Sequence, residues 1–350
     1  MTAASEAPVR EPSLVGHLLE EFLPFAPPPG PLPDATPAEG PDPYGNPDPD
    51  WLRIDWRRHL RRVEVPMPGE EPAPDVEQPS ASTRTEVDYV ELSPTKPERA
   101  TILFVHGLSG SWQNWLENLP HFARTHRVVA LDLPGFGHSP IPSWRISIES
   151  YARLVYRFCD AIEIGDCAIV GNSMGGFISA EAAADQPDRF ERLVLVSAAG
   201  VSSARLRRRP AETAARMVTG AAPLLLRLQE RGMRRPRLRQ AAFKGLFQHP
   251  ELLRRELLLE QFHTGAGKPG FLPAVQGLVG YDMLDQLDDV EVPALIVWGR
   301  NDHVVPAQDA VEYGQHLRNS QTVIFDDTGH LPQLERPLRF NRVLETFLRS

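Results

Sequence analysis

A serine lies at the corner of a strand-to-helix pattern near the middle of the chain. Residues 167–182 read Cys-Ala-Ile-Val-Gly-Asn-Ser-Met-Gly-Gly-Phe-Ile-Ser-Ala-Glu-Ala, which places Ser173 inside a Gly-x-Ser-x-Gly motif. The apolar run before the serine and the small, nearly uncharged residues after it favour a buried strand followed by a helix packed on a sheet. Such a sharp turn projects the hydroxyl away from the backbone, and the two glycines leave room that side chains would fill. Ser173 is therefore predicted to be a nucleophile.

A serine nucleophile needs a base that removes its proton and a carboxylate that orients the base. Both residue types follow β-rich segments farther along the chain. Asp302 comes after the apolar segment 292–298, and His330 follows the short segment 322–325 within the sequence Asp-Asp-Thr-Gly-His-Leu-Pro. We predict that His330 is the base and that Asp302 orients it.

Other aspartates compete with Asp302 for this role. One group precedes the segment 292–298 instead of following it, and a solvated connection accounts for its members better: Asp282, Asp285, Asp288 and Asp289. Asp326 and Asp327 are close to His330 in the sequence, but they are expected to serve the end of the strand there. Asp302 is the favoured assignment.

The chain order of serine, aspartate and histidine resembles that of the α/β-hydrolase fold family. Four motifs carry the resemblance over residues 55–350: His106-Gly107 after a strand at 101–105, the run Asp-Leu-Pro-Gly-Phe-Gly-His-Ser at 132–139 after a strand at 127–131, the Ser173 turn, and the paired Asp302 and His330 loops. The resemblance implies that His106 braces its loop. It also implies that the main-chain N–H groups of Leu108 and Met174 stabilise an oxyanion. Trp112 and Phe136 are predicted to line the substrate pocket on their positions alone.

Strand and helix patterns alternate along most of the chain. Strand patterns at 59–65 and 86–92 come first, and helical patterns then alternate with strands at 112–124, 148–164, 174–185, 307–317 and 338–348. This alternation predicts an α/β protein with a mainly parallel central sheet, an antiparallel start and helices on both faces. Together with the resemblance, it predicts an α/β-hydrolase core made of residues 51–200 and 281–350.

Two segments depart from this pattern. Residues 1–50 hold 13 of the 35 prolines, and their nine acidic residues face a single arginine, so this segment is predicted to be a largely disordered acidic arm. Residues 201–280 carry 15 basic against 5 acidic residues, whereas the rest of the chain carries 22 against 41. Because this second segment is rich in helix formers and too long for a simple connection, it is predicted to be a basic helical lid inserted over the site.

Composition also limits the partners. No nucleic-acid motif accompanies the basic clusters of the lid and the net charge is −9, so no nucleic-acid partner is expected. Contact between the basic lid and an anionic lipid surface stays a hypothesis that rests on charge alone. The chain has no run of 18 apolar residues, and its only two cysteines, Cys159 and Cys167, lack metal-ligand spacing. We expect no metal, no cofactor and a reducing cytoplasm.

The favoured function is a serine hydrolase that cleaves a carboxylic ester or a similar acyl bond of a small molecule. The Gly-Asn-Ser-Met-Gly-Gly elbow also resembles that of hydrolases that cleave carbon–carbon bonds in ring-fission products, although these often carry an aromatic residue where this chain has Leu331. Acyl transfer and perhydrolysis would use the same three residues, and a non-catalytic ligand-binding protein of the same fold is a further alternative. The sequence leaves the natural substrate and the oligomeric state open.

Overall fold

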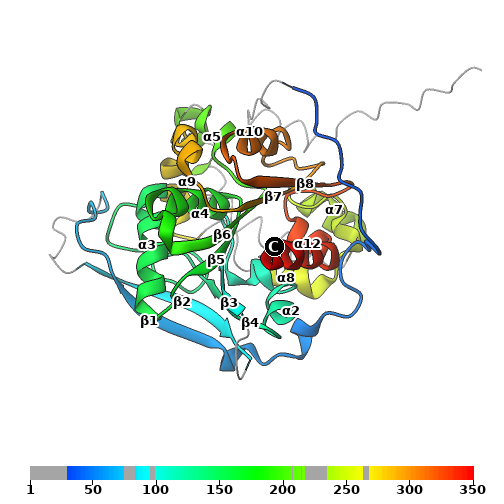
Figure 1. Cartoon of the computed structure of the whole chain (residues 1–350), viewed down its shortest axis with the longest axis horizontal. Helices are drawn as coiled ribbons and strands as arrows, with labels where there is room; N and C mark the ends of the chain where they lie inside the picture. The colour runs from blue at the N-terminus through cyan, green and yellow to red at the C-terminus, as the bar shows by residue number, and fades with distance from the viewer. Residues whose placement is uncertain are drawn as a thin grey trace, which may run out of the picture.

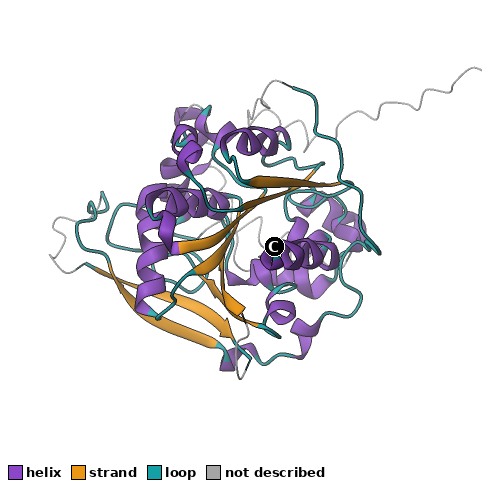
Figure 2. Ribbon diagram, in the orientation of Figure 1, coloured by secondary structure: helices purple, strands orange, loops and turns teal. Residues whose placement is uncertain are grey.

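In the computed structural model, eight strands form one twisted sheet with helices on both sides (Figures 1 and 2). The structure describes residues 30–74, 83–94, 99–206, 208–213, 215–216, 235–262 and 268–350. The strand order across the sheet is β1-β2-β4-β3-β5-β6-β7-β8. The strands are β1 (Leu60–Pro66), β2 (Arg84–Leu92), β3 (Arg99–Val105), β4 (His126–Leu131), β5 (Cys167–Asn172), β6 (Phe190–Val196), β7 (Ala294–Gly299) and β8 (Ser320–Phe325).

The sheet begins antiparallel and continues parallel. β1 pairs antiparallel with β2, and β2 pairs antiparallel with β4. All the other neighbouring pairs, from β4–β3 to β7–β8, are parallel. Because parallel strands end at the same edge of a sheet, the loops after β3 to β8 share that edge. The predicted fold class is confirmed.

Side chains along β3 alternate between two apolar cores. Leu103 and Val105 face the core that includes α3 and α4, whereas Ile102 and Phe104 face the core that includes α2 and α12. All four side chains are fully buried. Burial on both faces explains why the second half of this strand, residues 102–105, is an unbroken apolar run in the sequence.

The helices divide between these two faces. The first core receives α3 (Ile148–Ala161), α4 (Met174–Asp185), α5 (Val201–Ala204), α9 (Phe271–Leu278) and α10 (Gln308–His316). The second core receives α2 (Leu119–Phe122), α7 (Pro236–Phe243), α8 (Arg255–Phe262), α11 (Pro332–Glu335) and α12 (Pro337–Arg349). Short 3-10 turns are η1 (Asp50–Arg53), η2 (Trp56–Arg58), η3 (Trp112–Trp115), η4 (Pro187–Arg189), η5 (Pro250–Leu252) and η6 (Leu284–Asp289).

The helix predicted over residues 112–124 is interrupted. The structure has the 3-10 turn η3 first and the one-turn helix α2 after it. Pro120 lies in the first turn of α2. Proline has no N–H for a hydrogen bond inside a helix, and its ring clashes with the preceding turn, so it starts a new helix here instead of continuing the old one.

The N-terminal segment differs from its prediction. Residues 1–29 lie outside the described residues, but the following residues lie against the core instead of forming a disordered arm. Thr36 N donates to Ile324 O at 2.8 Å and Thr36 Oγ1 accepts from Ile324 N at 3.0 Å, so the chain pairs with the open edge of β8. Farther along, Arg339 of α12 donates to Asp42 at 3.2 Å. Hydrogen bonds from polar groups hold this proline-rich segment against the core, although the segment has no large apolar face. We call residues 36–50 the N-terminal strap.

The described parts of residues 201–280 are short helices that lie against the loops after the strands. Gln261 of α8 donates through Nε2 to Gln113 O at 2.8 Å, and Gly270 N donates to Gly135 O at 3.0 Å. Leu246 O accepts from His330 N at 2.9 Å. Several arginines of the basic clusters, including Arg231 and Arg234, lie outside the described residues. The segment thus contacts three of the loops that carry the motifs, and its role as a lid stays a prediction.

A buried carboxylate joins the start of this segment to the core. Asp309 of α10 is fully buried, and its Oδ2 accepts from Ser202 N at 2.9 Å and from Ser202 Oγ at 2.8 Å. Burial raises the pKa of Asp309 to about 6, while the two hydrogen bonds from Ser202 oppose the rise. The unfolded chain therefore releases this proton at lower pH than the folded protein does.

The expected result is that the contribution of Asp309 to stability falls as pH rises from about 4 to about 6. The raised pKa corresponds to a loss of about 3 kcal/mol over this window, because each pKa unit is worth about 1.4 kcal/mol. Asp309→Asn has no such proton. Its melting temperature should therefore rise relative to that of the wild type as pH increases from about 4 to about 6. Glu312→Gln removes a partly exposed carboxylate of the same helix and should show a much smaller gain. Parallel pH profiles for Asp309→Asn and the wild type would refute the assignment.

Candidate active site

Ser173 occupies the turn between β5 and α4. Its backbone angles are φ 56° and ψ −123°, a conformation that L residues rarely adopt. In the run 167–183 it is the one residue that is not buried. The turn therefore presents this side chain alone, while its neighbours anchor the turn in the core.

The glycines on either side of Ser173 make this turn possible. A Cβ on Gly171 would lie 2.5 Å from Ser179 Oγ and would overlap the backbone of Gly175. A Cβ on Gly175 would overlap the main-chain carbonyl of His106 at the end of β3. Both positions are closed to any side chain by backbone that cannot move aside easily, which accounts for the Gly-x-Ser-x-Gly pattern in physical terms.

His330 and Asp302 form a buried pair. His330 Nδ1 donates to Asp302 Oδ2 at 2.7 Å, and the side chains are 4% and 0% exposed. Asp302 Oδ1 accepts from the main-chain N–H groups of Val304 at 2.7 Å and Val305 at 2.9 Å. Main-chain N–H groups of its own loop therefore hold the Asp302 carboxylate in position to accept from the His330 ring. Because Nδ1 carries the shared proton, Nε2 is the nitrogen left to accept another.

The loop of His330 lies beside the Ser173 turn. Asn172, the residue before the serine, donates through Nδ2 to His330 O at 3.5 Å and to Val196 O at 3.0 Å. Within the described residues, Ser173 Oγ makes no hydrogen bond, so the serine and histidine side chains are not directly bonded in this structure. The Asn172 side chain therefore links the serine turn to the main chain of His330, a role that the Gly-Asn-Ser-Met-Gly-Gly motif did not indicate.

The two predicted oxyanion donors are free and close to Ser173. A Cβ added to Gly107 would lie 2.8 Å from Ser173 Cβ, so the loop after β3 runs directly along the serine. In the part of the chain that the structure describes, neither Leu108 N nor Met174 N donates a hydrogen bond. Met174 N is also the first N–H of α4, where helices leave donors without internal partners.

His106 has the bracing geometry that the family resemblance implied. Its Nδ1 donates to Gly107 O at 2.7 Å, and its Nε2 accepts from Leu133 N at 2.9 Å. Burial lowers the pKa of His106, which favours this neutral form. Asp132 supports the same region, because it accepts from Trp112 N and His138 N, both at 2.8 Å. Both ring nitrogens of His106 are occupied, so the ring links two loops.

Trp112 and Phe136 are core residues in this structure. Trp112 is 4% exposed and packs on Trp56 with ring centroids 4.9 Å apart. Phe136 is 1% exposed and meets the His106 ring edge to face at 5.8 Å. Their use in substrate binding stays a prediction. Position in the sequence placed them near the loops but could not show which way their rings face.

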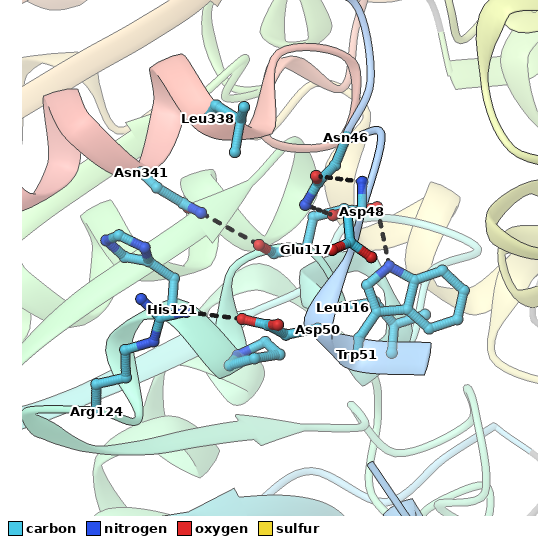
Figure 3. Close-up of a pocket in the computed structure, with 11 residues that line it drawn as sticks. Asn46, Asp48, Asp50, Trp51, Leu116, Glu117, His121, Arg124, Leu338 and Asn341 are labelled. Atoms are coloured by element: carbon cyan, nitrogen blue, oxygen red, sulfur yellow. Dashed lines mark hydrogen bonds and ion pairs between the residues drawn. The ribbon is translucent and has the colours of Figure 1, made fainter. Parts of the chain in front are cut away.

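One cavity of about 320 Å³ lies away from these residues (Figure 3). It is lined by Asn46, Asp48, Asp50, Trp51, Leu116, Glu117, Pro120, His121, Arg124, Leu338 and Asn341. Figure 3 shows the Asn46 amide and the Trp51 ring nitrogen pointing to Glu117, at 3.0 and 2.9 Å. Residues of the N-terminal strap and of α12 both line the cavity, and none of the three predicted catalytic residues does.

The competing aspartates lie elsewhere. Asp282, Asp285, Asp288 and Asp289 are exposed and lie at or in η6, before β7. Asp326 pairs with Arg300 at 3.6 Å, and Asp327 pairs with His249 at 2.7 Å. Of all these carboxylates, Asp302 is the one bonded to His330 in the described structure.

Within the described residues, no group of three or more histidine, cysteine or acidic residues could hold a metal ion. The same residues include no helix that is long and apolar enough to cross a membrane. Cys159 and Cys167 are both free and buried.

Comparisons with known proteins agree with the fold. A sequence model of the alpha/beta hydrolase fold matches residues 100–337. The chain is 31% identical over 258 residues to the dihydrolipoyllysine-residue acetyltransferase component of an acetoin cleaving system from Cupriavidus necator, covering 71% of this chain and 63% of that protein's length. It is 30% identical over 264 residues to a 2-hydroxy-6-oxo-2,4-heptadienoate hydrolase from Pseudomonas putida, covering 71% and 88%. A bacterial membrane phospholipase A structure matches with a TM-score of 0.58 and 27% identity, over 83% of this chain and 86% of that one.

Proposed function

The chain belongs to the alpha/beta hydrolase fold family and is a serine hydrolase of that fold, and from this premise we propose that it cleaves carboxylic esters with Ser173, His330 and Asp302. The observation that carries the proposal is the buried His330–Asp302 pair beside a strained serine turn. This pair leaves one imidazole nitrogen free to accept a proton. A serine hydroxyl next to such a base can attack an acyl carbon.

The chemistry divides into two half-reactions. In the first, His330 Nε2 takes the proton of Ser173 as Oγ bonds to the acyl carbon, and the same proton then goes to the leaving alkoxide. In the second, His330 takes a proton from water as the water oxygen bonds to the acyl carbon. The serine ester bond breaks, the carboxylic acid leaves, and Ser173 recovers its proton. Asp302 stabilises the imidazolium that forms in each half.

The negative oxygen of the two tetrahedral intermediates would be held by Leu108 N and Met174 N. The support for this assignment is that both groups lack partners within the described residues and that the loop of Leu108 runs along Ser173. Preorganised donors of this kind are worth about 2.7–4 kcal/mol each in the transition state.

The missing hydrogen bond between Ser173 and His330 is compatible with this mechanism. Catalytic hydrogen bonds are often long in free enzymes and tighten only when substrate binds. Described residues of the segment 201–280, in α8 and in the turns at Leu246 and Gly270, contact the loops of Gln113, Gly135 and His330. We therefore propose that this segment forms a lid over the acyl substrate. We also propose that the protein works in the reducing cytoplasm, since both cysteines are free.

Carbon–carbon bond hydrolysis is the second candidate, and a specific observation favours it. The Pseudomonas putida relative named for a 2-hydroxy-6-oxo-dienoate substrate is 30% identical and is covered over 88% of its length. Against this candidate stands Leu331, a buried aliphatic residue at the position after His330.

A substrate panel separates the two candidates. We expect kcat/KM for p-nitrophenyl butyrate to exceed kcat/KM for a 2-hydroxy-6-oxo-dienoate by about 10²-fold or more, because a pocket built for one acyl group discriminates strongly against another. A fluorophosphonate probe should label the wild type, which identifies an activated serine without any choice of substrate. A preference for the dienoate would replace the ester proposal. A folded protein that the probe does not label would contradict serine catalysis altogether.

A further inference from the structure

Glu335 is a fully buried carboxylate directly behind the His330 loop. It ends α11, and its side chain is 0% exposed. Its Oε1 accepts from Gly329 N at 3.0 Å and from Leu331 N at 3.2 Å. Because Gly329 and Leu331 flank His330, this one side chain fixes the main chain on both sides of the imidazole-bearing residue.

Two more donors reach Glu335 from distant parts of the chain. Gln248 N donates to its Oε2 at 2.8 Å, and the hydroxyl of Tyr44 donates to the same oxygen. The Tyr44 oxygen itself accepts from His249 N at 2.8 Å. Tyr44 therefore links the N-terminal strap and the segment after α7 to the carboxylate behind the histidine.

The charge of Glu335 depends on these donors. Within the described residues, no lysine, arginine or histidine forms an ion pair with it. Burial raises the pKa of Glu335, and the hydrogen bond from Tyr44 is the strongest single effect that opposes the rise. A carboxylate accepts at all its positions, whereas a protonated carboxyl would turn a donor toward the surrounding N–H groups. Tyr44 thus helps to keep Glu335 in the form that holds the loop.

Tyr44 is itself held in place from several directions. The Arg336 guanidinium lies over its ring at 4.7 Å, and the His249 ring meets it edge to face at 5.3 Å. The next residue, Gly45, donates through N to Glu335 O at 2.7 Å. These contacts therefore hold the Tyr44 hydroxyl in a defined position next to Glu335.

We propose that Tyr44 of the N-terminal strap is a positioning residue for His330, acting through Glu335 and the main chain of Gly329 and Leu331. This inference rests on the proposed role of His330 as the base. Its physical basis is that Nε2 must reach Ser173 Oγ, and that a misplacement of about 1 Å in a reacting group can cost 10²-fold in rate. The strap would then complete the active site although it lies far from Ser173 in the sequence.

The test is Tyr44→Phe in the full-length chain, measured with p-nitrophenyl butyrate. The ring and its contacts with Arg336 and His249 are kept, and the hydroxyl alone is lost. We expect kcat to fall about tenfold, because the His330–Asp302 pair stays intact but is held less firmly in its position relative to Ser173. Since His330 acts in both half-reactions and does not bind the acyl group, KM should stay within about twofold of the wild-type value.

Asn46→Ala is the matched control from the same strap. It removes the hydrogen bond from Asn46 to Glu117 at 3.0 Å, a contact that does not reach the His330 loop. This variant should keep the wild-type kcat even where its melting temperature falls. An equal loss of kcat in both variants would show that the strap acts only through stability, and it would overturn the proposal.

A second measurement needs no substrate. The Nδ1 proton shared by His330 and Asp302 should give a far-downfield proton NMR signal, which is expected to broaden or shift in Tyr44→Phe and to stay unchanged in Asn46→Ala. Tyr44→Phe protein with wild-type kcat and an unchanged signal would overturn the positioning role. Fluorophosphonate labelling of the wild type distinguishes this failure from that of the proposed function, because labelling of Ser173 does not depend on Tyr44 being correctly assigned.

Discussion

Replacing Ser173 with alanine is expected to lower kcat toward an activated ester by about 10⁶-fold, the scale on which loss of a serine nucleophile removes this chemistry. The substitution takes away the oxygen that forms the acyl bond and changes little else. Ser173 is partly exposed, and its hydroxyl makes no hydrogen bond within the described residues. Its backbone at φ 56° is no harder for alanine than for serine, so the melting temperature should stay close to that of the wild type. Ester turnover and thermal unfolding are the two measurements.

Ser143→Ala provides the control for this prediction. Ser143 is an exposed loop serine whose main-chain oxygen, not its side chain, bonds to Ala73 N at 2.8 Å. The variant should keep both the wild-type rate and the fluorophosphonate labelling, whereas Ser173→Ala should lose both. Labelling that survives in Ser173→Ala would place the nucleophile on another side chain.

Short-range patterns were enough to predict the sheet and the serine turn. Residues 102–105 are apolar throughout because this part of β3 is buried on both faces. Gly171 is closed to a side chain by the backbone of Gly175, four residues on, whereas Gly175 is closed by the distant carbonyl of His106. The apolar run and the Gly-x-Ser-x-Gly spacing are local sequence patterns, so both can be recognised without knowledge of the fold, although the contact that closes Gly175 is not local. The pairing of Asp302 with His330 is a longer contact, which the places of the two residues after β-rich segments suggested and the family resemblance supported.

Contacts between distant segments could not be predicted in this way. The strap was expected to be disordered because it has few apolar residues, yet Thr36 pairs with the edge of β8 and Tyr44 reaches Glu335 across 291 positions. The composition of a proline-rich segment does not show that the segment will pair with the open edge of a strand or reach a buried carboxylate. For the same reason, Trp112 and Phe136 were placed in the pocket by position while their rings pack in the core.

The second large effect is expected from Asp302→Asn. Asp302 Oδ1 accepts from Val304 N and Val305 N, and its Oδ2 accepts from His330 Nδ1 at 2.7 Å. An asparagine must keep its carbonyl oxygen on the two main-chain donors, so its amide N–H₂ has to face Nδ1. The imidazole then holds its proton on Nε2, the atom that must accept the proton of Ser173. The wrong tautomer should lower kcat by about 10⁴-fold while the pocket and the melting temperature change little.

Asp326→Asn makes the same chemical change on the loop that carries His330. Asp326 is 64% exposed and lies 3.6 Å from Arg300, so its loss should leave the rate within about twofold of the wild type, the small effect typical of exposed ion pairs. The comparison isolates the tautomer argument, because both variants lose one negative charge near the same histidine. If Asp302→Asn loses no more activity than Asp326→Asn, the carboxylate bonded to Nδ1 does not set the proton position, and His330 must be oriented by its main-chain contacts with Asn172, Leu246 and the Glu335 network alone.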